Sequence, residues 1–435
     1  MRLNRGAAAG LCLVLATACS GGSPGGPRSS IDIGVDLPLT GPEARAAQPA
    51  LNGIQFFFAR HPSVDGYTVV LTPTDDARGE AANPDLGLGD IQRFIADQRL
   101  LAVLGPFDAS VARREIPAAN AAGLALVSPA TSSPCLTRDV YVPPALNPAG
   151  TAVTCKEAGL PAASALRPTH LNDYFRLTTT DDLQGPAAAD YATKTLHLVR
   201  VGVLSDHEAY GQALADSFTA RLQRLGGTVV GHLDLNPAAS TDTTAWLKQM
   251  KAAGAQAIYF GGATSGKGCS IRSAMRDVFG AGEAAPFLGG DGIADDPACV
   301  TAAGSNSPGI FATVPIVDAA TASGAASVIS AFKAAYRNAR DYGPYTVVAY
   351  DAAAVLYAAL DRAIRAAGGQ VPPRGNVVSQ LTVTAGFAGA TGPIGFDAAG
   401  DTTHRVVSIY EPAGSDPALP WRFVQAIDYS AALPY

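Results

Sequence analysis

Two short segments combine polar side chains with the expected start of a helix, and such segments can bind a carboxylate. They are residues 107–110 and residues 130–132. Backbone N–H groups at a helix N-terminus carry partial positive charge and point at an anion bound there, and hydroxyl groups add further donors. Ordinary capping of the helix by Asp108 and Ser110 is the alternative interpretation, and the two roles are compatible.

One aspartate could supply the complementary group for an ammonium ion. Asp291 lies in the sequence Gly-Gly-Asp-Gly at residues 289–292, and these glycines allow a tight loop that a ligand can approach closely. An aspartate in such a turn can instead accept a hydrogen bond from its own backbone, which is the competing interpretation.

Motifs for catalysis or metal binding are missing from the sequence. It contains no Gly-x-Ser-x-Gly nucleophile motif and no Cys-x-x-Cys pair, and its six histidines are scattered singly. The sequence of residues 261–268 is similar to a phosphate-binding loop motif. However, Gly268 occupies the position at which that motif has a Ser or Thr that binds magnesium. We therefore expect no metal, no cofactor and no enzymatic activity.

The overall composition is that of a globular protein. The 435 residues are 48% hydrophobic and 16% charged, and the net charge of −6 is spread along the chain without a basic stripe. A nucleic-acid-binding protein would normally show such a stripe, so we expect no nucleic-acid partner. The length predicts two or three domains.

The N-terminus predicts export and lipid attachment. Basic residues precede a short apolar segment, which has the length of a signal-peptide core and is too short to span a membrane. Residues 16–19, Ala-Thr-Ala-Cys, resemble a bacterial lipobox that begins with Ala instead of Leu or Val; a plain secretory signal is the alternative. We expect a signal peptide over residues 1–18, lipid on Cys19, and a Gly/Ser/Pro-rich tether over residues 19–30 that holds the protein at the outer face of the membrane.

Four further cysteines predict disulfide bonds. An even number of cysteines in an exported protein favours disulfides, and four cysteines allow three pairings. We expect Cys135–Cys155 and Cys269–Cys299 because each of these pairs is local in the sequence.

Short apolar segments alternate with helical patterns along the chain, and these strands and helices must position the residues named above. This alternation predicts parallel sheets with helices on both faces. It stops between residues 128 and 172, a Pro-, Ala- and Thr-rich segment that we call the excursion, and then restarts, which suggests two lobes. The expected strands are residues 31–35, 67–72, 101–104, 124–127, 199–204, 229–230, 257–260, 406–410 and 423–427. The expected helices are residues 49–60, 90–97, 110–122, 211–225, 244–253, 271–279, 325–340 and 346–367.

Several short blocks of sequence, taken in their order along the chain, match the pattern of a known protein family. They are residues 33–41, 103–110, 127–137, 175–185, 210–211, 259–262, 288–292, 350–352 and 392–396. In this order the chain resembles the type I periplasmic binding proteins of the leucine/isoleucine/valine class. The resemblance extends from Ile31 to the C-terminus and implies an α/β fold of two doubly wound lobes joined by three hinge crossings.

The resemblance also implies where the lobes divide. The crossings are expected near Thr178, Val314 and Gly392. Lobe 1 then comprises residues 31–178 and 315–392, and lobe 2 comprises residues 179–314 and 393–435. The ligand is expected between the lobes, at the carboxyl ends of the strands.

The binding residues implied by the resemblance come from both lobes. The family's contacts to a ligand carboxylate and ammonium fall in lobe 1 on Ala109, Ser110, Ala130, Thr131 and Ser132. In lobe 2, Asp291 matches an acidic residue that pairs with the ammonium, and Tyr210 matches a tyrosine that lines the cleft, although it could be a generic aromatic at a helix start. Thr264 follows Ala263 at a strand end where relatives often carry an aromatic residue, so a larger ligand side chain has room there.

One residue departs from the pattern of the family. Asp108 places a negative charge beside the expected carboxylate site, where relatives are mostly neutral. If it faced the cleft it would favour a cationic or neutral ligand, whereas it could instead point at its own helix.

The resemblance implies the function of a solute-binding protein. We expect a monomer that captures an amino acid or a derivative and presents it to the permease subunits of an ABC importer. An exported sensor with the same fold, coupled to signalling instead of transport, is the alternative.

Overall fold

The computed structural model describes residues 28–235, 243–280 and 285–434. The expected signal peptide, Cys19 and most of the expected tether lie outside these residues. The tether does not extend to residue 30, because strand β1 (Arg28–Leu37) begins at Arg28, which pairs with Tyr67 of β3. Within the described ranges, none of the helices has both the length and the apolar character needed to cross a bilayer.

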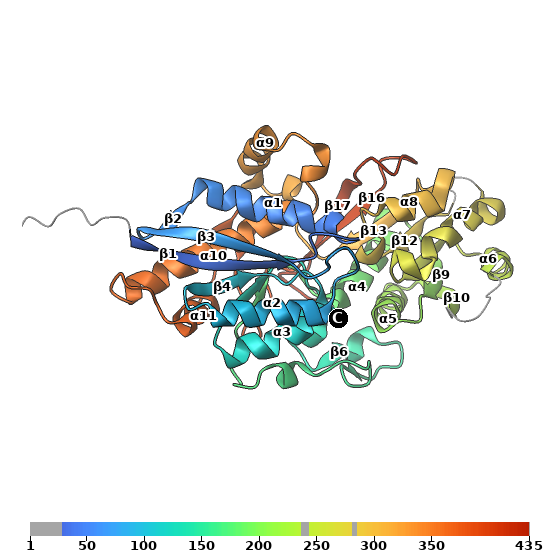
Figure 1. Ribbon diagram of the computed structural model, residues 1–435. Coiled ribbons are helices and arrows are strands. Elements are labelled where there is room, and N and C mark those ends of the chain that lie inside the picture. The colour runs from blue at the N-terminus through green and yellow to red at the C-terminus, as the bar shows by residue number, and fades with distance from the viewer. Residues whose placement is uncertain (1–27, 236–242, 281–284, 435) are drawn as a thin grey trace, which may run out of the picture.

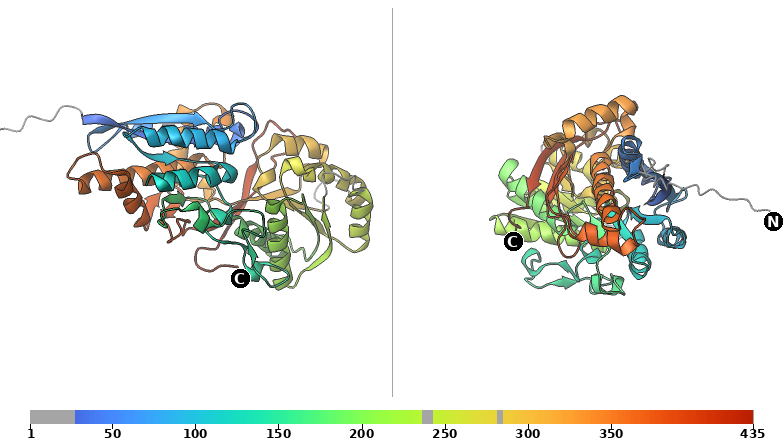
Figure 2. Two further views of the ribbon diagram at one scale, coloured as in Figure 1. Left: turned by 60° about the horizontal axis from the view of Figure 1, so that its bottom comes forward. Right: turned by 90° about the vertical axis from the view of Figure 1, so that its left-hand side faces the viewer.

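The fold is α/β with two lobes, each built on its own sheet (Figure 1). The left view of Figure 2 shows the same separation, with the green and yellow segments in the second lobe. In lobe 1 the strand order is β2-β3-β1-β4-β5-β8, and all pairs except β2 with β3 are parallel. The remaining strands of this sheet are β2 (Ser63–Val64), β3 (Tyr67–Asp75), β4 (Leu100–Leu104), β5 (Ala125–Ser128) and β8 (Tyr174–Arg176).

Helices cover both faces of the lobe 1 sheet. One face is packed by α1 (Ala44–Arg60), α10 (Thr346–Ala366) and α11 (Arg374–Thr382), and the other by α2 (Pro84–Ala96) and α3 (Ala109–Ala121). Strand β4 is buried along its whole length because both of its faces meet helices, which explains why its sequence is continuously apolar.

Lobe 2 has a seven-stranded sheet in the order β10-β9-β11-β12-β13-β16-β17, in which the last two strands are antiparallel. The strands are β9 (Arg200–Ser205), β10 (Thr228–Asp234), β11 (Ala257–Gly261), β12 (Phe287–Gly289), β13 (Ile310–Val314), β16 (Val406–Glu411) and β17 (Arg422–Asp428). On one face lie α4 (Gln184–Asp190) and α5 (Ala209–Arg224), and on the other α6 (Thr243–Ala252), α7 (Gly268–Phe279) and α8 (Pro297–Ala303).

Every expected strand and helix is present with shifted ends, apart from one helix that is shorter than expected. The helical pattern over residues 325–340 forms α9 (Ala325–Ala335), so the prediction is wrong beyond Ala335. Asn338 caps a separate turn there: its side chain accepts from the Arg340 N–H, and Asp341 accepts from the Asn338 N–H. Asn favours such local hydrogen bonds over the interior of a helix.

Three segments run between the lobes near their shared boundary. The Thr179 N–H donates to Pro315 O at 2.9 Å, so the segments that follow β8 and β13 lie side by side. A hairpin of β14 (Phe387–Gly389) and β15 (Gly392–Ile394) contacts α10 of lobe 1, and the chain enters the lobe 2 sheet at Val406.

Candidate functional site

One amide side chain joins two carboxylates at the boundary between the lobes. Gln184, at the start of α4, donates through Nε2 to Asp181 at 3.0 Å and to Asp291 at 2.9 Å. Its Oε1 accepts from the Asp291 N–H at 3.1 Å. Asp181 begins the turn Asp181–Leu183 after the first crossing, and Asp291 begins the turn Asp291–Ile293 after β12. Gln184 is fully buried and therefore holds the two acidic turns at a fixed separation.

Tyr210 completes this arrangement from the first turn of α5. Its hydroxyl donates to Asp291 Oδ1 at 2.5 Å and accepts from the Gly292 N–H at 3.1 Å. A Cβ atom at Gly290 would lie 2.7 Å from this hydroxyl, so a glycine is needed for the close approach of the loop. The structure thus brings together Tyr210 and Asp291, two residues that the sequence singled out.

Ser132 connects lobe 1 to the same group of residues. The Asp181 N–H donates to the backbone carbonyl oxygen of Ser132 at 3.0 Å. We call Ser132, Asp181, Gln184, Tyr210 and Asp291 the acidic network. Asp181 and Gln184 were not expected as site residues, although both lie in the block of residues 175–185 that carries the resemblance.

Ala130 and Thr131 do not join the acidic network. Their N–H groups both donate to Ser128 Oγ, at 3.2 and 3.0 Å, so these two donors are engaged within lobe 1. The Thr131 hydroxyl donates to Ser128 Oγ at 2.7 Å and also contacts the hydroxyl of Tyr174. Thr131 is buried at 2% exposure because β8 brings Tyr174 beneath it.

The start of α3 is capped by its own aspartate. The Ser110 N–H donates to Asp108 Oδ1 at 2.6 Å, so Asp108 points at its own helix. Ala109 and Ser110 are partly exposed and make no contact with the acidic network that the structure records among its described residues. Thr264 lies nearer, because its hydroxyl donates to Gly292 O at 3.4 Å.

Tyr345 of lobe 1 interacts electrostatically with the acidic network and was not expected from the sequence, whereas its neighbour Phe107 belongs to the segment 107–110 that the sequence singled out. Phe107 and Tyr345 pack edge to face with ring centroids 5.1 Å apart. Burial raises the pKa of Tyr345 well above its ordinary value, and the charges of Asp291 and Asp181 raise it further. Tyr345 immediately precedes α10, so its position depends on how that helix docks on lobe 1 and is not visible in a local pattern.

Among the described residues, the carboxylates of the acidic network form no ion pair, and the buried charge of Arg176 lowers the pKa of Asp181. Burial raises the pKa of both Asp181 and Asp291, and the charge of Asp291 raises that of Asp181 further. Hydrogen bonds from Tyr210 and Gln184 lower the pKa of Asp291 and offset part of its burial. Among the residues that the structure describes, no Lys, Arg or His forms an ion pair with either carboxylate. Their hydrogen-bond donors are neutral, which leaves the pair suited to a cation.

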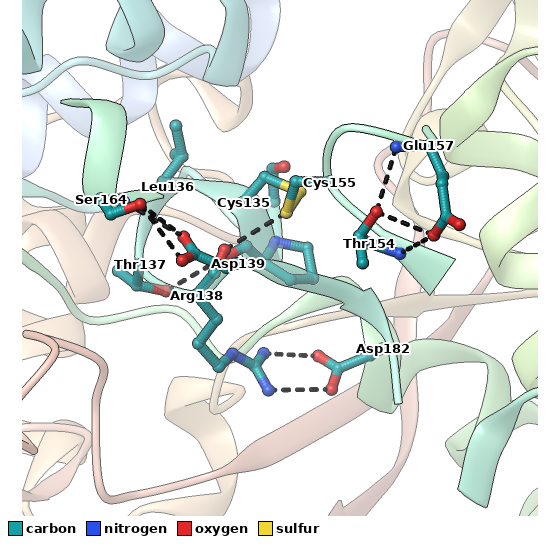
Figure 3. The surroundings of a disulfide bond; sticks show 12 residues. Cys135, Leu136, Thr137, Arg138, Asp139, Thr154, Cys155, Glu157, Ser164 and Asp182 are labelled. Carbon is teal, nitrogen blue, oxygen red and sulfur yellow. Dashed lines mark hydrogen bonds and ion pairs between the residues drawn. A yellow bond between two sulfur atoms is a disulfide. The ribbon is translucent and has the colours of Figure 1, made fainter. Parts of the chain in front are cut away.

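The excursion lies against both lobes: Leu136 and Leu166 pack with α3 of lobe 1, and other parts of it contact α5 of lobe 2. It contains the short strands β6 (Val140–Val142) and β7 (Val153–Thr154), and it packs on α5 at Ala209 and Ala213 (Figure 1). Figure 3 shows Arg138 of the excursion paired with Asp182 through two hydrogen bonds of 3.2 and 2.9 Å.

Both expected disulfides are confirmed. Cys135–Cys155 closes the excursion, with Cα atoms 5.7 Å apart (Figure 3). Cys269–Cys299 joins α7 to α8 on the face of lobe 2 away from α5, with Cα atoms 5.1 Å apart. The described residues contain no group of three or more His, Cys, Asp or Glu side chains arranged for a metal ion.

Comparison with known proteins gives a consistent result. The sequence model of a family described as periplasmic binding protein matches residues 30–416. An amino acid binding protein of Pseudomonas aeruginosa is 28% identical over 286 residues, which cover 63% of this chain and 64% of the relative, just under two thirds of its length. A protein of Brucella melitensis named Leu/Ile/Val-binding protein homolog 3 is 28% identical, over 77% of this chain and 80% of the relative. A solved leucine binding protein of Thermotoga maritima shares the fold with a TM-score of 0.67 at 24% identity, over 91% of this chain and 98% of that structure.

Proposed function

This chain belongs to the type I periplasmic binding proteins of the leucine/isoleucine/valine class, and from that premise we propose that it binds an amino acid at the acidic network and delivers it to an ABC importer. As a member of this family it is an extracytoplasmic solute-binding protein and not an enzyme. The relatives are named for leucine, isoleucine and valine or for amino acids in general, which supports this class of ligand.

The observation that carries the proposal is the buried pair Asp181 and Asp291, which form no ion pair with any residue that the structure describes. A buried carboxylate without a positive partner is costly, and two that share one amide are more costly still. An α-ammonium group placed between them supplies the missing charge and up to three donors. A neutral sugar or a carboxylic acid without an amine cannot supply that charge.

We place the ligand carboxylate toward lobe 1, at the side chains of Ser132 and Ser110. Ser132 is part of the acidic network, and Ser110 lies in the first turn of α3, where the helix dipole favours an anion. The N–H groups of Ala130 and Thr131 are engaged by Ser128, so this pose relies on hydroxyl groups. Phe107 and Tyr345 then face the ligand side chain.

The mechanism we propose is closure of two lobes on a bridging ligand. The first two crossings are adjacent at Thr179 and Pro315. We place the third between Asp401 and Val406, beyond the position expected near Gly392, because Phe396 packs on Phe175 of β8 at 5.1 Å. A ligand that contacts both lobes favours the closed form by its differential affinity.

The N-terminus supports attachment to the outer face of the membrane. We propose that lipid on Cys19 anchors the protein there and that residues preceding β1 act as the tether. Globomycin treatment of cells expressing the full chain tests this: accumulation of an uncleaved precursor is expected, and unchanged processing would refute lipidation.

Thermal unfolding of the mature chain, from Ser29 onward, tests the ligand class. Branched-chain, aromatic and polar amino acids are compared with the matched acids and amines, because a ligand that binds only the folded state raises the melting temperature. A rise with one group of amino acids and none with the acid lacking the amine is the expected result. A rise with sugars or with acids alone would overturn the assignment of Asp181 and Asp291 as the ammonium site.

A further inference from the structure

The loop that carries Asp291 also bears two further aspartates. Asp295 and Asp296 lie between the turn Asp291–Ile293 and α8. Asp295 has a φ of 49°, a left-handed conformation that is uncommon for residues other than glycine, so the chain bends sharply directly before α8. Asp296 Oδ1 accepts from the Ala298 N–H at 2.9 Å and thereby caps α8, which fixes this carboxylate in lobe 2.

Arg45 of lobe 1 pairs with this loop across the boundary between the lobes. It lies in the first turn of α1, and its Nη2 is 3.6 Å from Asp296 Oδ1. The two side chains are 27% and 22% exposed, so the pair is largely shielded from water. A cation at the start of a helix opposes the helix dipole, so α1 gains no stability from Arg45 at this position. The partner in lobe 2 does account for the position of Arg45.

Arg340 of lobe 1 makes a second connection to lobe 2. It lies in the turn Ala339–Asp341 between α9 and α10. Its Nη2 donates to the carbonyl oxygen of Pro417 at 2.9 Å and also to that of Ala418. Both acceptors belong to the connection between β16 and β17, so a second arginine of lobe 1 holds a loop of lobe 2.

The two arginines are fixed relative to each other and act on the same aspartate. The Asn52 side chain of α1 donates to the backbone of Asp341 at 3.1 Å, so the turn that carries Arg340 is docked on the helix that carries Arg45. Burial raises the pKa of Asp295, whereas a backbone hydrogen bond and the charges of Arg45 and Arg340 lower it. We call the four charged residues of this contact the ionic latch; they are Arg45, Arg340, Asp295 and Asp296.

The ionic latch is a modest and reversible contact. The separation of 3.6 Å between Arg45 and Asp296 exceeds the value of about 2.7–2.9 Å that is typical of a charge-assisted hydrogen bond. Arg45 Nη1 is buried and forms no hydrogen bond with any residue that the structure describes. Removal of these charges from water costs free energy that offsets much of their attraction. Contact and separation therefore differ little in free energy, as a reversible movement of the lobes requires.

The position of the ionic latch couples it to the acidic network. In Figure 1, α1 and α8 lie in the upper half of the molecule, whereas β6 of the excursion lies in the lower half, so the latch and the excursion contact the lobes on different sides. Asp295 and Asp296 follow Asp291 by four and five residues in the loop after β12. A displacement of the latch therefore also moves the loop that bears the proposed ammonium site.

We infer that the ionic latch favours the closed arrangement of the lobes before a ligand binds. The inference rests on the lobe closure of the proposed function, and it adds that the equilibrium between open and closed forms depends on ionic strength. Salt screens charges that are partly exposed, so it weakens the latch and favours separation of the lobes. A ligand then acts on an equilibrium that is already biased toward closure.

Small-angle X-ray scattering of the ligand-free mature chain tests this inference, because the radius of gyration increases when the lobes separate. The radius of the parent protein is expected to increase between about 0.01 M and about 1 M salt, since the Debye length falls from about 30 Å to about 3 Å over this range. Arg45→Glu/Arg340→Glu replaces attraction by repulsion, so its radius should exceed that of the parent at low salt and decrease as salt is added. Arg45→Glu also places an acidic residue at the start of α1, where the helix dipole favours it, so we expect the variant to fold.

Two further variants separate the ionic latch from general effects of charge. Arg365→Glu changes an exposed ion pair with Asp361 inside lobe 1, and it is expected to keep the radius and the salt dependence of the parent. Asp296→Asn removes one charge of the latch but keeps a residue that can cap α8, and its radius should exceed that of the parent at low salt. Any other pattern, including a radius of the parent protein that does not change with salt, overturns the inference.

Ligand dissociation gives a second measurement, with leucine as the probe. Arg45→Gln and Asp296→Asn are each expected to speed dissociation about fivefold, the effect of losing one partly exposed ion pair. The double variant should dissociate no faster than either single variant, because both changes break the same contact. Additive effects would show that Arg45 and Asp296 act independently and would overturn the inference. Scattering needs no ligand, so failure of the latch is distinguishable from failure of the proposed amino-acid site.

Discussion

The hydroxyl of Tyr210 donates a hydrogen bond of 2.5 Å to the carboxylate of Asp291. The same carboxylate oxygen accepts from Gln184 at 2.9 Å, so two neutral donors from α4 and α5 fix its orientation without neutralising its charge. A carboxylate that is held in place yet uncompensated is arranged to receive a cation.

Replacement of Asp291 by Asn tests the charge with little change of shape. Asp291→Asn is expected to weaken amino-acid binding at least about tenfold in isothermal titration, because the ammonium loses a buried ionic partner. Asp277→Asn, on the exposed face of α7 in the same lobe, is the matched control and is expected to have no effect. Equal affinity in Asp291→Asn and the parent protein would refute the placement of the ammonium.

Ligand affinity is expected to fall as the pH is lowered. Burial raises the pKa of Asp181 and Asp291, so these groups take up protons at a higher pH than exposed aspartates and then no longer attract an ammonium. Tyr210→Phe removes a hydrogen bond that lowers the pKa of Asp291, and it should move this loss to higher pH. Dissociation constants measured from about pH 8 to about pH 4 check both expectations, and a pH-independent affinity would contradict them.

The stability of lobe 1 is expected to have the opposite dependence on pH. Burial raises the pKa of Asp76 to about 8, with further increases from Asp36, Asp108, Glu43 and Asp75. The folded state therefore keeps a proton that the unfolded state has released, and the free energy of unfolding should decrease as the pH rises from about 4 to about 8. Denaturant unfolding at a series of pH values measures this trend. Asp76→Asn should make the dependence shallower, and an unchanged slope would be inconsistent with the assignment.

The disulfide of the excursion is expected to affect ligand release as well as stability. Cys135→Ser/Cys155→Ser should lower the free energy of unfolding by about 3 kcal/mol and speed ligand dissociation, because the excursion lies against α5. Cys269→Ser/Cys299→Ser removes a disulfide of similar span on the far face of lobe 2 and should cost similar stability without changing dissociation. Stopped-flow measurement of the ligand dissociation rate distinguishes the two double variants. Equal dissociation rates in the two variants would show that the excursion does not restrain the lobes.

Arg176 and Asp401 form a buried ion pair of 2.7 Å between β8 and the segment that leads to β16. Arg176 is fully buried, so Asp401→Asn leaves its charge uncompensated and is expected to lower the free energy of unfolding by about 3–5 kcal/mol. Asp361→Asn removes an ion pair with Arg365, which is 70% exposed, and should cost at most about 0.5 kcal/mol. A similar small loss in both variants, measured by chemical denaturation, would contradict the prediction.

The regular elements could be predicted from the sequence because their patterns are local. The apolar strands, the amphipathic helices and both disulfides depend on residues close together in the chain. Strands β8, β12 and β13 were not predicted, and two of them are only three residues long. Such short strands are defined by the neighbours with which they pair and not by their own composition.

The candidate site could be predicted only in part. Ser132, Tyr210 and Asp291 meet as expected, but they are joined through Asp181 and Gln184, whose proximity depends on the path of the first crossing. Thr131 turns away because its hydroxyl reaches Tyr174, which is a consequence of how β5 and β8 pair.

The positions of the two tryptophans give the molecule an intrinsic optical probe. Trp246 lies buried on α6 inside lobe 2, where its surroundings are the same whatever the distance between the lobes. Trp421 lines a cavity between α9 of lobe 1 and β17 of lobe 2, and we expect its solvent environment to change when the lobes separate. The emission of the unlabelled protein therefore contains one constant component and one that reports lobe motion, and Trp246→Phe would isolate the second.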